Sequence, residues 1–188
     1  MPVFNLLIKI CWLLFIVVWV MFSFKAKRNV QSNRERQGSF IRFVIIFVVI
    51  AFLRTTIFRD LAHAKIFSSI HFVQGCGVLI CAVGIAFAIW ARIHIGKNWG
   101  MPMSKKIEPE LITTGPYRFV RHPIYTGLII AMIGSSFAES LTWIIWLVFL
   151  GGYFIYSAKN EEKSMMLQFP DKYPEYMRRT KMLIPFIF

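Results

Sequence analysis

Residues 121–158, RHPIYTGLIIAMIGSSFAESLTWIIWLVFLGGYFIYSA, decide the fold that we expect of this chain. Pro123 suits the first turn of a helix, because the N–H that it lacks has no partner there. The apolar residues 124–138 then form a short helix of about 22 Å. Glu139 and the serine after it leave almost no connection before the uncharged run 140–158. The stretch therefore predicts a tight hairpin of two antiparallel helices.

The remaining apolar runs place the chain in a membrane. Hydrophobic residues make up 57% of the sequence, and the runs 10–24, 43–53 and 72–91 carry no charge. An apolar run of about 18 residues or more is long enough to cross a hydrocarbon core about 30 Å thick. We therefore expect an all-α polytopic membrane protein with about five transmembrane helices, including the short hairpin, and a cytoplasmic carboxyl-terminal tail. The expected spans are 4–24, 41–58, 67–92, 124–138 and 140–158.

The charge distribution predicts the orientation of these spans. The formal net charge is +13, and 18 of the 22 Lys and Arg residues lie in 25–42, 92–121 and the tail from residue 159. These three segments fall on one side of the five spans, and short loops rich in Lys and Arg stay in the cytoplasm. We expect the amino terminus outside and the carboxyl terminus inside, in a cell inner membrane or the endoplasmic reticulum. Anionic membrane lipid is the partner that explains the basic charge, and no nucleic acid is needed.

A polar corner precedes the short helix. Arg118, Arg121 and His122 lie just before Pro123, where a helix start leaves unpaired N–H groups and a partial positive charge. Together they predict an anion-binding corner at the membrane surface. Each arginine alone can also be an ordinary basic residue at the cytoplasmic end of a span. That alternative does not explain His122, because a neutral imidazole adds no charge there. Gly127, on the first turn, allows another backbone or a ligand to come close.

A pair of carboxylates follows the hairpin. Glu161 and Glu162 lie just beyond the second helix, and a tight hairpin brings its two ends together. We expect them beside the Arg/His corner, as a site for a zwitterionic ligand. The alternative is a solvated helix surface on which Lys159 and Lys163 pair with them.

Two further segments have two interpretations each. Trp99, in IGKNWG (95–100), is either a membrane-interface anchor or a residue that lines a pocket. The tail beyond Pro170, with Tyr173, Tyr176 and Arg179, is either a basic membrane-surface segment or a flap that folds back over the corner. The three cysteines lie in apolar runs without metal-ligand spacing, so we expect no metal site.

The motifs taken together resemble a known superfamily. GPYRFVRHPIYTG (115–127), NEE (160–162) and YMRRTKMLIP (176–185) are similar to those of the integral membrane methyltransferases, which include isoprenylcysteine carboxyl methyltransferase and the phospholipid N-methyltransferases. The resemblance covers about residues 95–188. It implies S-adenosylmethionine as the methyl donor, in a pocket roofed by the cytoplasmic tail. It also implies a lipophilic or prenylated acceptor that enters sideways from the bilayer.

The resemblance also implies roles for individual residues. The catalytic residues it implies are Arg121, His122 and Glu161. The cofactor pocket is implied to include Tyr117, His122, Tyr125, Gly127, Glu161 and Glu162. We expect the acceptor to contact Trp99, Arg121 and Arg179. The resemblance implies that Arg121 steadies a carboxylate of either the cofactor or the acceptor, and that Arg179 closes the pocket.

The function expected from these observations is methylation of a membrane-dissolved acceptor. We expect one membrane domain over 1–188, with three spans in 1–92 and the cofactor-binding loop, hairpin and tail in 93–188. The most direct expectation is carboxyl O-methylation of an isoprenylcysteine-like molecule. N-methylation of a phospholipid ethanolamine headgroup is the alternative within enzymes. A non-catalytic membrane scaffold or small transport subunit is the alternative of another class.

Overall fold

The computed structural model describes residues 2–23, 70–96, 110–140 and 142–185, and the regular secondary structure of this part is all-α. It consists of five α-helices and one short 3-10 helix, and Val120 and Lys181 form an isolated bridge between two non-helical segments. The elements are α1 (Pro2–Ser23), α4 (His71–Ile95), η2 (Gly115–Arg118), α5 (Pro123–Ala138), α6 (Thr142–Gln168) and α7 (Lys172–Arg179).

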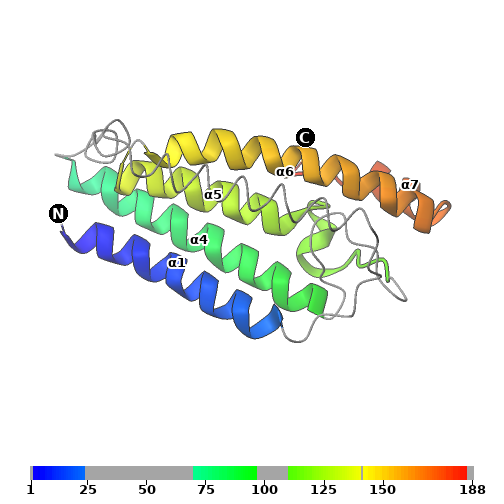
Figure 1. Ribbon diagram of the computed structural model, residues 1–188, viewed down its shortest axis with the longest axis horizontal. Coiled ribbons are helices and arrows are strands. Elements are labelled where there is room, and N and C mark those ends of the chain that lie inside the picture. The colour runs from blue at the N-terminus through cyan, green and yellow to red at the C-terminus, as the bar shows by residue number, and fades with distance from the viewer. Residues whose placement is uncertain (1, 24–69, 97–109, 141, 186–188) are drawn as a thin grey trace, which may run out of the picture.

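The long helices lie lengthwise beside one another. In Figure 1 α1, α4, α5 and α6 follow in that order across the molecule, and η2 and α7 lie at one end of it. The helix α4 packs against both α1 and α5, and α5 packs against α6. The tight hairpin predicted from residues 121–158 is therefore confirmed, with α5 and α6 separated by only three residues.

Three of the described helices are long and apolar enough to cross a membrane. The segments concerned are 3–22, 71–95 and 142–168. They correspond to the first, third and fifth expected spans. The helix α5 has 16 residues and is shorter, as its sequence predicted. The expected span 41–58 lies outside the described residues. The structure thus supports a polytopic helical membrane protein.

The helix α6 continues past residue 158, where we expected the fifth membrane span to end. It runs unbroken for 27 residues to Gln168, about 40 Å, and Pro170 follows shortly after. A hydrocarbon core is about 30 Å thick, so the last turns of α6 extend past it. Glu161 and Glu162 lie on these turns.

Glycines allow α4 and α5 to touch through their backbones. A Cβ atom added to Gly84 would lie 2.5 Å from the backbone nitrogen of Ala131, and one added to Gly127 would lie 2.6 Å from the oxygen of Gly84. Two turns further along the pair, Gly77 and Gly134 make the same kind of contact. Small residues permit this close approach in membranes. Gly77 and Gly84 therefore bring the backbone of α4 against that of α5.

Polar contacts tie α1 to this pair. The indole Nε1 of Trp12 donates to Oγ of Ser135 at 3.1 Å, and the ring of Trp12 stacks on Trp143 with 5.0 Å between centroids. At the other end of α1, the buried guanidinium of Arg92 donates to the oxygen of Phe22 at 2.6 Å. The contacts with α1 and α4 hold α5 in place and thereby position its first turn.

Candidate active site

The corner before α5 is joined to the carboxyl-terminal tail. The backbone N–H of Arg121 donates to the oxygen of Lys181 at 2.8 Å, and that of His122 donates to Met182 at 3.1 Å. The hydroxyl of Thr126 donates to the oxygen of Leu183 at 2.7 Å. The tail therefore folds back over the corner, as the second of its two interpretations predicted.

The side chain of Arg121 points into this junction. Its Nε donates to Oε1 of Glu162 at 2.6 Å, and both side chains are about nine-tenths buried. Its Nη1 donates to the oxygens of Thr180 and Met177. The carboxylate that Arg121 binds in this structure is thus one of the protein's own.

His122 lies between the two glutamates. Its Nδ1 is 3.6 Å from Oε2 of Glu161 and its Nε2 is 3.4 Å from Oε1 of Glu162. The hydroxyl of Tyr125 donates to the other oxygen of Glu161 at 2.6 Å. Glu161 remains 28% exposed, whereas the His122 side chain is 9% exposed. The expected juxtaposition of the imidazole and the acids is therefore present.

One nitrogen of this cluster has no hydrogen-bond partner. Nε2 of His122 is buried and makes no hydrogen bond, because its contact with Glu162 lacks hydrogen-bond geometry. On α6, one turn before Glu161, the buried Oγ of Ser157 is also without a hydrogen bond. A buried polar atom left unpaired costs about 1–3 kcal/mol. A ligand that reached either atom would supply the missing hydrogen bond.

A stack of rings leads from the cluster toward the middle of α6. The rings of His122 and Tyr125 are nearly parallel with centroids 5.6 Å apart, and Tyr125 stacks on Phe154 at 4.8 Å. Phe154 is buried. Since the rings extend along the α5–α6 pair, they hold the imidazole in a fixed plane.

The surroundings control the protonation of the corner. Burial by itself lowers the pKa of His122, but the contacts and negative charges of Glu161 and Glu162 outweigh it and raise that pKa above its ordinary value. Tyr117 is buried as well, and burial strongly raises the pKa of its hydroxyl. Tyr117 therefore stays neutral at physiological pH.

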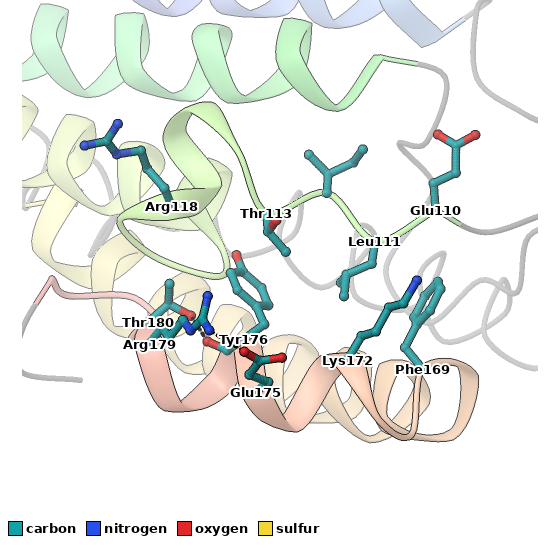
Figure 2. A pocket seen from close by; sticks show the side chains of 11 residues that line it. Glu110, Leu111, Thr113, Arg118, Phe169, Lys172, Glu175, Tyr176, Arg179 and Thr180 are labelled. Atoms are coloured by element: carbon teal, nitrogen blue, oxygen red, sulfur yellow. Dashed lines mark hydrogen bonds and ion pairs between the residues drawn. The ribbon is translucent and has the colours of Figure 1, made fainter.

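A polar cleft of about 820 Å³ lies beside the cluster. Figure 2 shows Arg118 and Thr113 on one side of it and the α7 residues Glu175, Tyr176 and Arg179 on the other. The hydroxyl of Tyr176 donates to the oxygen of Tyr117 at 2.6 Å, which fastens α7 to η2. The full lining is Glu110, Leu111, Ile112, Thr113, Arg118, Phe169, Lys172, Glu175, Tyr176, Arg179 and Thr180. His122, Glu161 and Glu162 do not line this cleft.

The remaining residues singled out from the sequence lie around the cluster. Gly127 faces α4, so the close approach predicted there is to another helix, and its place in a cofactor pocket stays a prediction. Arg179 lines the cleft and pairs with Glu175 on the exposed face of α7. Trp99 lies outside the described residues.

Sequence reasoning missed Phe154 and Ser157. Both lie on the face of α6 that also carries Glu161, at helical spacings of three and four residues. Counting that spacing backward from Glu161 would have identified both residues in the sequence. No sequence pattern identifies Thr126, which joins α5 to the tail.

Several known proteins are similar to this chain. The model of the phospholipid methyltransferase family matches residues 72–172. The nickel-cobalt-cadmium resistance protein NccN of Alcaligenes xylosoxydans xylosoxydans is 30% identical over 112 residues, which are 58% of this chain and 46% of NccN. The protein-S-isoprenylcysteine O-methyltransferase of Tribolium castaneum is 27% identical over 128 residues, which are 63% of this chain and 43% of that protein.

A solved structure shares the fold. The eukaryotic intramembrane Ras methyltransferase ICMT (isoprenylcysteine carboxyl methyltransferase) superposes with a TM-score of 0.56 at 21% sequence identity. The match covers 84% of this chain and 55% of that structure. This chain thus spans about half the length of these relatives, 46% and 43% of the two curated ones.

Proposed function

Because the chain belongs to the phospholipid methyltransferase family, we propose that it is an S-adenosylmethionine-dependent methyltransferase acting on a lipophilic acceptor in the membrane. The observation that carries the proposal is the cluster of His122, Tyr125 and Glu161 under the folded-back tail. All three residues lie inside the segment matched by the family model.

The polar groups of the cluster suit this cofactor. S-adenosylmethionine carries an ammonium group and ribose hydroxyls, and the partly exposed carboxylate of Glu161 can accept hydrogen bonds from either. The unpaired Nε2 of His122 would gain a partner from a bound ligand. When bound, S-adenosylmethionine supplies a methyl group on a sulfonium for in-line displacement.

The residues of the site then act mainly by holding the acceptor in line. A carboxylate acceptor is already a nucleophile at neutral pH, so no base would be needed. The new O–C bond would form as the bond between the methyl group and sulfur broke, with S-adenosylhomocysteine as the leaving group. An amine acceptor must first lose a proton, and His122 or Glu161 can take it. Arg179 and Trp99 are proposed to contact the acceptor.

For the acceptor we propose the carboxylate of an isoprenylcysteine-like molecule. Two kinds of relative, one curated and one structural, carry that activity in their names. The family's own name supports the alternative, N-methylation of a phospholipid headgroup. A labelled-methyl assay with membranes separates the two, because a methyl ester is released by base and an N-methyl headgroup is not.

Titration calorimetry with S-adenosylhomocysteine tests the enzyme class. We expect micromolar binding by the purified protein, lost in His122→Ala and in Glu161→Ala. Lys163→Ala, an exposed change on the same helix, is the matched control and should bind like the wild type. No binding by the wild type would instead favour a scaffold or transport subunit.

We also propose that the site faces the cytoplasm, with the amino terminus outside and the whole chain forming one membrane domain. The bias of Lys and Arg toward one side supports this orientation. A cysteine placed at Lys172, which is exposed on α7, should react with a membrane-impermeant maleimide only after the cell is opened. Labelling of intact cells would contradict the orientation.

A further inference from the structure

Arg121 is engaged by the protein on two sides. One nitrogen binds the buried carboxylate of Glu162, and another binds the carbonyl oxygens of Thr180 and Met177. The side chain is only 9% exposed. A bound carboxylate would therefore have to displace Glu162 in order to pair with Nε.

The carbonyl groups that Arg121 binds belong to the end of α7. This helix ends at Arg179 with Thr180 as its C-cap, and the last carbonyls of a helix lack intrahelical partners and carry partial negative charge. A cation placed there satisfies both the hydrogen bonds and the charge. Arg121 thus caps α7 from a different segment of the chain.

The same contacts hold the residues that follow α7. Lys181, Met182 and Leu183 accept hydrogen bonds from Arg121, His122 and Thr126 in succession, and the chain there lies parallel to the segment before α5. Met182 and Leu183 pack their side chains against Tyr125 and the α6 residue Ala158. The tail is therefore fixed over the cluster by the short ladder and by Arg121, whose side chain binds the end of α7 and is itself held by Glu162.

We infer that Arg121 and Glu162 form a latch that positions the tail, and that Glu161 is the carboxylate of the pair that contacts the ligand. Arg121 is then a positioning residue that acts through Thr180 and the tail. The second half of this inference rests on the proposed function, and the first half does not.

Limited trypsin digestion tests the latch without any ligand. Cleavage after Lys181 releases residues 182–188, and its rate reports how often the tail opens. We expect Glu162→Gln and Arg121→Lys to speed this cleavage about tenfold or more, because breaking a buried ion pair leaves an uncompensated group. Glu161→Gln is the matched control, and its tail should stay as resistant as that of the wild type.

Glu162→Gln keeps the shape of the side chain, so it answers the question if Arg121→Lys does not fold in detergent. The latch is overturned if folded Glu162→Gln releases the tail at the rate of the wild type. It is equally overturned if Glu161→Gln releases the tail as fast as Glu162→Gln does.

Kinetics with a farnesylated cysteine carboxylate separate positioning from acceptor binding. A latch predicts that Arg121→Lys weakens S-adenosylhomocysteine binding about tenfold while the KM for the acceptor changes less than about twofold. A raised acceptor KM with a resistant tail would show instead that Arg121 binds the acceptor. If the wild type binds no S-adenosylhomocysteine, the proposed function fails, and trypsin digestion alone decides the latch.

Discussion

The contact between α4 and α5 makes a quantitative prediction for Gly134→Ala. The new Cβ atom would lie 2.5 Å from the oxygen of Gly77 and would also meet the backbone of Cys81. Ordinary contact begins at 3.4 Å, so the helices must separate by about 1 Å at this level. Overpacking of this kind costs about 1–3 kcal/mol. We expect the free energy of unfolding to fall by that amount.

Gly151→Ala supplies the control for this change. Gly151 lies within α6, and a Cβ atom added there meets nothing within 4 Å. The intrinsic helical gain of alanine over glycine, about 1 kcal/mol, is then measured without the clash. Thermal unfolding in detergent should place Gly134→Ala roughly 2–12 °C below the wild type, and Gly151→Ala at or above it. Equal unfolding temperatures for the two variants would refute the backbone contact.

Three further changes test other parts of the structure. Ser157→Ala removes a buried hydroxyl without a partner and should raise the free energy of unfolding by about 1 kcal/mol in the same thermal assay; a loss of stability would show that the hydroxyl is paired. Trp12→Phe removes the hydrogen bond to Ser135 and should lower the free energy of unfolding by about 1 kcal/mol. An unchanged free energy of unfolding would contradict that hydrogen bond. The raised pKa of His122 adds stability that is complete below the ordinary value of 6.5 and is lost as the pH rises through the folded-state pKa. The unfolding temperature should therefore fall across that range, and His122→Gln should flatten the dependence.

The hairpin and the meeting of its two ends could be predicted because the rules involved are local. Pro123 fixes where one helix begins, and the lack of residues around Glu139 leaves no room for anything but a tight reversal. Once the hairpin exists, His122 and the glutamates must share one end of it. The predicted neighbourhood followed from chain geometry.

The partners of individual side chains could not be predicted in the same way. Arg121 binds carbonyl oxygens that lie 56 and 59 residues further along the chain, and a backbone carbonyl has no signature in a sequence. Gly127 was compatible with a ligand or another helix, and only the packing of α4 decides between them.

The glycine contact also determines which parts of the molecule are able to move. The backbones of α4 and α5 are in contact over two turns, so we expect the two helices to move as one rigid unit. His122 lies at the amino-terminal end of α5 and belongs to this unit. If the site opens to admit a molecule the size of a nucleoside, we therefore expect α7 or the polar end of α6 to be displaced. We therefore expect movement at the segment between α6 and α7 and not within the α4–α5 pair.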